Sequence, residues 1–232
     1  MIKYLVFLTA VVACSSHLVA GPVTVSPATY SVGMIDGTCE CAENFSAPGS
    51  YSFGGMTASV TVFPDTSLQV TAGQYGSAGA QMIYYFAVQS NQGSTTDGVT
   101  IPLIIFYSLS ASGQGNGQSA TAQISAGGEE AEAYSTQSPG TLGGYLDVSY
   151  VTGQEGSITL QVSASGGSEA SADPYIEIDP SFAGASNYSI VVSQGVGNVA
   201  PSGVPEPGTI ALCGGGFLAL FYGLRRRKRE AL

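Results

Sequence analysis

The chain has 232 residues, of which 16 are acidic and six basic, so its formal net charge at pH 7 is −10. No Lys or Arg occurs between Tyr4 and Leu224, a stretch that includes the body of the protein between its two terminal segments. A surface without cations cannot displace the counterions of a phosphate backbone, which excludes nucleic-acid binding by the body. The 32 glycines and the 9% of charged residues also disfavour a helical fold, because strong helix formers are scarce.

The N-terminus has the organisation of a secretory signal peptide, which we predict at residues 1–20. Lys3 supplies a positive start, residues 4–13 are apolar, and Leu18-Val19-Ala20 forms a small-residue cleavage region. The sequence Val11-Val12-Ala13-Cys14 also resembles a lipobox, so a lipoprotein signal is the alternative. Either signal would direct the chain through the secretion translocon.

Cys39 and Cys41 are the thiols that remain after signal removal if Cys213 leaves with the C-terminal tail. They flank Glu40 in a predicted loop, and export implies an oxidising compartment. A bridge across one residue closes a tight ring, so a local disulfide, a redox pair and an intermolecular disulfide all stay open. Two thiols are too few to define a metal site.

Residues 21–194 are predicted to form one β-sandwich domain of immunoglobulin-like or jelly-roll type. Apolar and polar residues alternate with a period of two, and no convincing 3.6-residue period accompanies them. The first two alternating segments should pair across Pro64-Asp65. The alternating segments lie at residues 59–62, 68–71, 146–150, 158–162 and 188–192.

Two further segments, residues 82–88 and 101–107, are apolar on both faces. This pattern predicts central strands that are covered by a layer on each side. The glycine-rich polar segments 112–118, 126–140 and 166–173 are predicted to be surface loops, and residues 195–203 a flexible stalk after the last strand.

Catalysis has few side chains available, because the body holds no Lys or Arg and the single histidine, His17, lies in the signal peptide. Ser-His triads, Cys-His dyads and Schiff-base lysines are therefore excluded, and we expect a non-enzymatic protein. A glycoside hydrolase needs only two carboxylates and is the remaining enzymatic alternative. Its candidate residues are Glu129, Glu130 and Glu132, or Asp173, Glu177 and Asp179.

Calcium binding is the better-founded alternative for the carboxylates, since this cation prefers oxygen ligands and no Lys or Arg competes for them. The candidate ligands are Asp173, Glu177 and Asp179. Alternation puts Glu177 and Asp179 on one face of a strand and leaves Ile176 and Ile178 for the core. No ordered Asp-x-Asp-x-Asp-Gly loop is present, so no cofactor is assigned.

The C-terminus combines three elements in a fixed order. A Pro-Glu-Pro motif, Val204-Pro205-Glu206-Pro207, precedes an uncharged apolar segment over residues 208–224. A basic cluster follows, formed by Arg225, Arg226, Arg227, Lys228 and Arg229. About 17 apolar residues is near the lower limit for a membrane-spanning helix, and the basic cluster should stay in the cytoplasm, which places the body outside.

This arrangement over residues 204–229 resembles the PEP-CTERM sorting signal of Gram-negative bacteria. The resemblance implies processing near the motif by exosortase, an intramembrane cysteine protease-transpeptidase, in a producer of exopolysaccharide or biofilm. We therefore expect an exported protein, held first in the inner membrane and then placed at the cell surface or in the extracellular matrix, with extracellular polysaccharide as a partner. The alternative is a calcium-dependent or carbohydrate-binding adhesion module. Tyr84 and Tyr85 could present a stacking face for it, but strands favour tyrosine for packing, so a place in the core or at its rim is the default for both.

Overall fold

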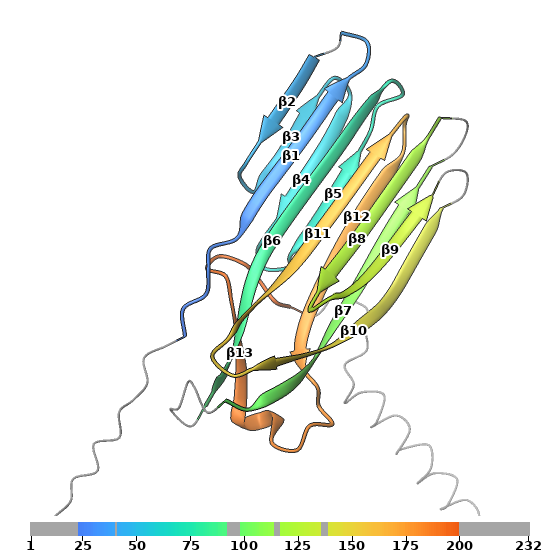
Figure 1. Ribbon diagram of the computed structural model, residues 1–232. Helices are drawn as coiled ribbons and strands as arrows, with labels where there is room; N and C mark the ends of the chain where they lie inside the picture. The colour runs from blue at the N-terminus through green and yellow to red at the C-terminus, as the bar shows by residue number, and fades with distance from the viewer. Residues whose placement is uncertain (1–22, 40, 92–97, 114–116, 136–138, 200–232) are drawn as a thin grey trace, which may run out of the picture.

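The computed structural model describes residues 23–39, 41–91, 98–113, 117–135 and 139–199, and two antiparallel β-sheets lie face to face in this part of the chain (Figure 1). The described residues form the thirteen strands β1–β13 and one 3-10 helix, Ala185–Asn187. The nearly all-β composition and the two-sheet, sandwich-like arrangement confirm the predicted fold class at this level.

The first sheet has seven strands in the order β2-β1-β6-β11-β8-β9, and β13 also pairs with β6. Strand β6 is central because β11 pairs along one side of it, while on the other side β1 pairs with its first half and β13 with its last five residues. The strands are β1 (Thr29–Asp36), β2 (Cys41–Phe45), β6 (Gly76–Ser90), β8 (Ser119–Ala126), β9 (Glu129–Ser135), β11 (Glu155–Ser165) and β13 (Tyr188–Val192).

The second sheet has six strands in the order β10-β7-β12-β5-β4-β3. The predicted hairpin across Pro64-Asp65 is confirmed, because β4 and β5 pair with Thr61 opposite Ser67. The strands are β3 (Gly49–Phe53), β4 (Met56–Thr61), β5 (Ser67–Thr71), β7 (Thr100–Ser112), β10 (Gly140–Val151) and β12 (Glu169–Ile178).

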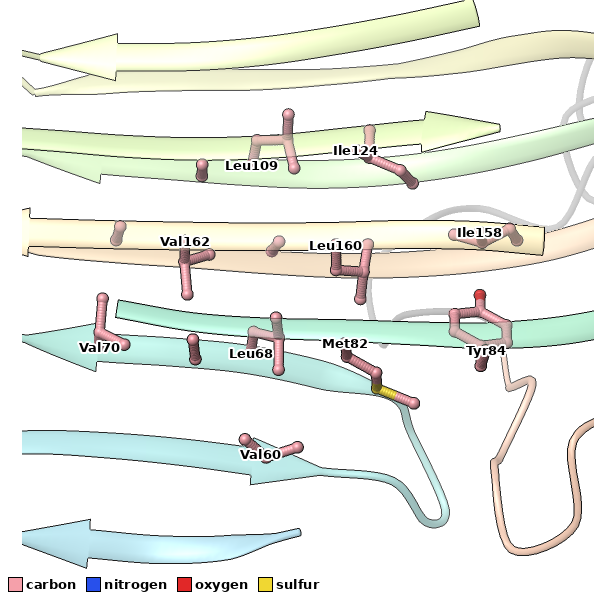
Figure 2. Close-up of a cluster of buried hydrophobic side chains, with 14 of the residues drawn as sticks. Val60, Leu68, Val70, Met82, Tyr84, Leu109, Ile124, Ile158, Leu160 and Val162 are labelled. Atoms are coloured by element: carbon pink, nitrogen blue, oxygen red, sulfur yellow. The ribbon is translucent and has the colours of Figure 1, made fainter. Parts of the chain in front are cut away.

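The core lies between the two sheets and contains the apolar half of each alternating strand (Figure 2). The fully buried side chains come from both sheets, so the alternation predicted from the sequence fixes which face of each strand is inside. The residues labelled in Figure 2 are Val60, Leu68, Val70, Met82, Tyr84, Leu109, Ile124, Ile158, Leu160 and Val162.

The prediction of a covering layer on each side of residues 101–107 is wrong in the described structure. Ile101, Leu103 and Ile105 are buried in the core, whereas Ile104 and Phe106 face outwards and are only half buried. A strand that is apolar on both faces can thus leave one apolar row at the surface of a two-layer sandwich.

The prediction of a loop over residues 126–140 is also wrong, since β9 (Glu129–Ser135) lies within it. A two-residue turn of Gly127 and Gly128, both with positive φ, joins β8 to β9, and this backbone suits a tight hairpin. The predicted loop over 166–173 is shorter than expected, because β12 begins at Glu169. The loop predictions failed because glycine and glutamate have a low strand propensity, and pairing in the sheet overrides this propensity.

The described part of the predicted stalk, residues 195–199, packs on the sandwich and is not a free linker there. Val196 is buried, and the backbone N–H of Gly197 donates a hydrogen bond to the carbonyl of Val62 (2.5 Å). The Asn198 side chain makes two hydrogen bonds to the backbone of Ile176, at 2.9 and 2.8 Å. Asn198 thereby takes the place of a strand partner beside β12, where β5 has already ended.

No helix in residues 23–39, 41–91, 98–113, 117–135 or 139–199 is long and apolar enough to cross a membrane. The predicted signal peptide at 1–20 and the predicted span at 208–224 lie outside the described residues.

Candidate functional site

The three predicted calcium ligands lie on or just after β12. Asp173 and Glu177 face outwards from the six-stranded sheet, while Ile176 between them is 1% exposed, as the alternation predicts. Asp179 follows the strand, and its carboxylate accepts a hydrogen bond from the backbone N–H of Ser181 at 2.8 Å. Among the described residues, no group of three or more His, Cys, Asp or Glu side chains could hold a metal ion.

The structure brings a fourth carboxylate, Asp65, close to Asp173. Asp65 lies in the loop between β4 and β5, and sequence reasoning missed it because 108 positions separate it from Asp173. Burial and, secondly, the negative charge of Asp65 raise the pKa of Asp173 to about 6. Neither carboxylate has a Lys or Arg nearby, because the body contains none.

The pKa of Glu177, which follows Tyr175 on β12 as Asp173 precedes it, is also raised. Burial raises the pKa of Glu177, the hydrogen bond that the Tyr175 hydroxyl donates to Glu177 Oε2 at 3.3 Å lowers it, and the charge of Asp179 raises it. One carboxylate oxygen each of Asp65, Asp173 and Glu177 is buried and has no hydrogen-bond partner in the described structure. Such oxygens lack the hydrogen bonds that buried polar atoms ordinarily make.

An aromatic row crosses the same outer face of the six-stranded sheet. Tyr145 of β10 lies directly opposite Phe106 of β7, and Phe106 lies directly opposite Tyr175 of β12. The ring centroids are 6.2 Å apart for Phe106 and Tyr145 and 6.1 Å apart for Phe106 and Tyr175. We call these three rings, with Asp147, Asp173 and Glu177 in the adjacent positions, the aromatic–acidic face.

Sequence reasoning did not identify the aromatic–acidic face. It assigned Phe106 to a doubly covered strand, and the tyrosines it considered for stacking were Tyr84 and Tyr85, with a core or rim position as their default. Tyr84 is in fact 1% exposed in the core, and Tyr85 lies beside the C-terminal segment, where its carbonyl accepts a hydrogen bond from the backbone N–H of Ser193 at 2.9 Å. The available signal was the outward phase of Tyr145 in the alternating segment Tyr145 to Val151.

The other predicted carboxylates, Glu129, Glu130 and Glu132, lie on β9 at the edge of the seven-stranded sheet. All three are exposed, and the Gln123 side-chain amide donates a hydrogen bond to Glu130 Oε1 at 2.6 Å. This group therefore lies on a different sheet from Asp173, Glu177 and Asp179.

A shallow hollow of about 270 Å³ lies on the outer face of the seven-stranded sheet. It forms where Gly33 and Gly79 provide no side chains, and Gln81 and Gln161 border it. None of its lining residues is acidic, so it does not supply the pair of facing carboxylates that glycoside hydrolysis requires.

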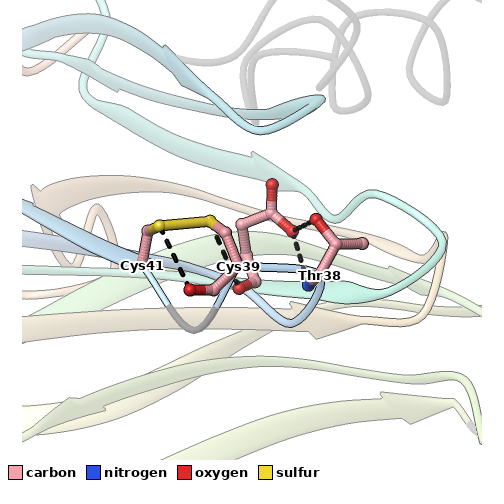
Figure 3. The surroundings of a disulfide bond; sticks show 4 residues. Thr38, Cys39 and Cys41 are labelled. Carbon is pink, nitrogen blue, oxygen red and sulfur yellow. Dashed lines mark hydrogen bonds between the residues drawn. A yellow bond between two sulfur atoms is a disulfide. The ribbon is translucent and has the colours of Figure 1, made fainter.

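Cys39 and Cys41 form a disulfide with each other at the turn between β1 and β2 (Figure 3). The turn is also held by Asp36, whose carboxylate accepts hydrogen bonds from the backbone N–H and the hydroxyl of Thr38 at 2.8 and 2.7 Å. These two bonds lower the pKa of Asp36. Of the alternatives left open by the sequence, the described structure has the local bridge.

The predicted sorting residues lie outside the described residues; they are Val204 to Pro207 and Arg225 to Arg229. The sorting signal is therefore tested by comparison with known protein families. A family model of the PEP-CTERM protein-sorting motif matches residues 203–228. This match contains the whole Pro-Glu-Pro motif and the first four residues of the basic cluster.

No curated protein matches the chain. Among solved structures, one of TmCBM61 in complex with β-1,4-galactotriose has 10% sequence identity and a TM-score of 0.24, and the alignment covers 73% of this chain and 90% of that chain. A structure of the T13 IBDV viral particle has 12% identity and a TM-score of 0.19, with 80% and 56% covered. Similarities at these TM-scores carry no argument about function.

The sorting motif is thus identified both by its residues and by the family model. A PEP-CTERM motif indicates export followed by exosortase processing. The chain therefore carries a PEP-CTERM protein-sorting motif over residues 203–228, and this motif indicates an exported protein that is processed by exosortase.

Proposed function

We propose that the chain is a non-enzymatic protein of the cell surface or extracellular matrix, which associates with exopolysaccharide in a biofilm. The observation that carries this proposal is the sorting motif at residues 203–228. In this proposal the apolar segment over residues 208–224 first holds the chain in the inner membrane with the sandwich outside the cytoplasm, and exosortase then releases it.

The chemistry of the body supports a non-enzymatic role. It contains no Lys or Arg and, after removal of the signal peptide, no His, so acid–base and nucleophilic catalysis would depend on carboxylates and hydroxyls. The carboxylates with raised pKa lie on an outer sheet face beside aromatic rings. This placement favours binding over hydrolysis.

A sorting experiment in a Gram-negative host that carries an exosortase tests the proposal. Replacing Pro205, Glu206 and Pro207 together by Ala should leave the chain at full length in the inner-membrane fraction, whereas the wild type should be shortened and reach the surface or matrix fraction. Pro201→Ala is the matched control, since this proline precedes the motif, and it should behave as the wild type.

Equal release of the triple variant and the wild type would contradict sorting through the motif. The non-enzymatic part of the proposal has its own assay, in which the purified chain is incubated with neutral polysaccharides and reducing ends are measured. Any turnover that Asp173→Asn abolishes would favour the glycoside hydrolase instead.

A further inference from the structure

We propose that the aromatic–acidic face of the six-stranded sheet binds a neutral polysaccharide, with the sugar rings stacked on Tyr145, Phe106 and Tyr175. The inference deepens the proposed function and rests on it, because it names the surface through which an exported matrix protein would hold polysaccharide.

The first step is the strand register. Three strands that are adjacent in the sheet place one aromatic ring each at the same level, and the inward neighbours Leu146, Ile105 and Ile176 occupy the same level in the core. Two rows, one on each face, are thus fixed by the same pairing. The pairing fixes the backbone positions of the outer row as it fixes those of the core row, because all six residues belong to the paired strands β10, β7 and β12.

The second step is exposure. Tyr145 is 58% exposed, and its strand neighbours Asp147 and Ser149 are also exposed. Phe106 and Tyr175 are half buried. An aromatic row at a wet sheet face exposes apolar surface that contributes nothing to the core, and aromatic side chains with one open face are suited to stacking on a flat ligand.

The third step is the polar surround of the row. Asp173 and Glu177 lie one outward position to either side of Tyr175 on β12, and Asp147 lies opposite Ile104 in the same row of the sheet as Glu177. Asp173 Oδ1 and Glu177 Oε1 are buried and have no hydrogen-bond partner in the described structure. The face therefore places a carboxylate on both sides of the Tyr175 ring, and a ligand with hydroxyl donors suits this polar surround better than an apolar one.

The fourth step is the choice of ligand. A sugar ring has an apolar C–H face that stacks on aromatic rings and hydroxyl groups around its rim that donate to carboxylates. A polyanion is disfavoured, because the face is acidic and the body has no Lys or Arg. A metal ion is disfavoured, because the described carboxylates form no group of three that could hold one. A neutral polysaccharide has apolar ring faces for stacking and hydroxyl groups that donate, and it carries no negative charge that the acidic face would repel.

Affinity electrophoresis of the full chain, purified in a non-ionic detergent, tests this assignment. The probes are hydroxyethylcellulose and galactomannan, which are neutral, and carboxymethylcellulose, which has the hydroxyethylcellulose backbone with negative charges. We expect the neutral polymers to slow the wild type and carboxymethylcellulose to slow it much less. Mobility in polymer-free gels corrects for differences in charge.

Two matched pairs of variants locate the binding surface. Tyr145→Ala should weaken binding by about tenfold, because stacking on the exposed ring is lost, whereas Tyr134→Ala on β9 should bind as the wild type. Tyr134 is 59% exposed and lies on the other sheet, so the two tyrosines differ in position but not in exposure. Glu177→Gln should weaken binding and Glu132→Gln should not.

Circular dichroism verifies that each variant folds, and Glu177→Gln, which keeps the side-chain size, decides the test if Tyr145→Ala fails to fold. The proposal is overturned if no neutral polymer slows the wild type, or if Tyr145→Ala and Glu177→Gln bind as tightly as the wild type. It is also overturned if EDTA abolishes binding while these variants retain it, which would indicate a cation site. None of these results touches the sorting experiment, which depends on the C-terminal motif alone.

Discussion

Asp173 lies beside a second carboxylate, Asp65, in a body that has no Lys or Arg to neutralise either of them. Its folded-state pKa of about 6 is above the ordinary value of 3.8, so folding favours the protonated form. The resulting contribution to stability is fully present below about pH 3.8 and is lost as the pH rises through about 6. At neutral pH the folded protein therefore carries an unfavourable charge at this position.

Asp173→Asn should remove this charge and stabilise the protein at pH 7.5. Because the carboxyl is only half buried, solvent screening reduces the effect, and we expect a gain of about 1 kcal/mol, or a Tm rise of about 2–4 °C. The difference in Tm from the wild type should shrink as the pH falls through 6 towards 4. Thermal melts at both ends of this range measure it.

Glu132→Gln is the control for Asp173→Asn, since it replaces an exposed carboxylate on β9 by an amide. Its Tm should follow that of the wild type at both pH values. A Tm difference for Asp173→Asn that stays constant across the pH range would show that the carboxyl does not titrate in the folded protein as the pKa of about 6 requires.

At the scale of the elements, the packing of β11 against β6 and β10 depends on a glycine. Phe86 of β6 and Tyr150 of β10 form an edge-to-face pair with centroids 4.7 Å apart and an interplanar angle of 77°. Gly156 of β11 lies directly against both rings, and a Cβ there would be 2.5 Å from Tyr150 Cε1 and 2.6 Å from Phe86 Cζ. The two sheets can approach at this end because that Cβ is missing.

Gly156→Ala should therefore destabilise the sandwich by about 1–3 kcal/mol, since neither ring can move without disturbing the core. Gly143→Ala on β10 is the matched control, because the nearest atom to its Cβ would be the Tyr107 carbonyl oxygen at 3.9 Å. We expect it to change the free energy of unfolding by less than about 0.5 kcal/mol. Urea denaturation compares the two, and equal midpoints would contradict the packing described for Phe86 and Tyr150.

The assignment of inward and outward strand faces can be tested by substituting one residue from each face. Ile105 on β7 is 0% exposed, so Ile105→Asp would place an unpaired carboxylate in the core and should cost about 4 kcal/mol or more. Thr159 on β11 faces outwards, so Thr159→Asp should cost less than about 1 kcal/mol. Thermal melts separate the variants, and similar Tm values would contradict the assignment of the two faces.

At the scale of the whole molecule, the charges are separated along the chain. All the acidic residues except Glu230 precede Arg225, and five of the six basic residues form one cluster behind the apolar segment over residues 208–224. An acidic, cation-free body and a basic C-terminus fit opposite sides of a membrane, because basic residues are retained in the cytoplasm.

Replacing Arg225, Arg226, Arg227, Lys228 and Arg229 by Gln should weaken retention of the C-terminus in the cytoplasm and impair sorting. Glu230→Gln, in the same segment, should have no effect, since acidic residues contribute little to orientation. Reporter fusions at the C-terminus and cell fractionation measure the outcome. Unchanged orientation and processing in the five-residue variant would argue against the proposed topology.

The sequence by itself determined the fold class, the inward faces of most strands and the sorting signal. Each is a local property: a period of two residues selects the face of a strand, as Val60, Leu160 and Val162 show, and the sorting signal is a continuous segment. The restriction of Lys and Arg to the two ends is likewise read directly from the chain.

Only the tertiary structure decided which strands share a sheet and which apolar strand faces remain open. It placed Phe106 between Tyr145 and Tyr175, and Asp65 beside Asp173, although these residues are 39 to 108 positions apart. Alternation selects the face of a residue but not the partner strand or its register, because every strand of a sandwich has the same period of two. The aromatic–acidic face is built from register between distant strands, and so it exists only in the folded chain.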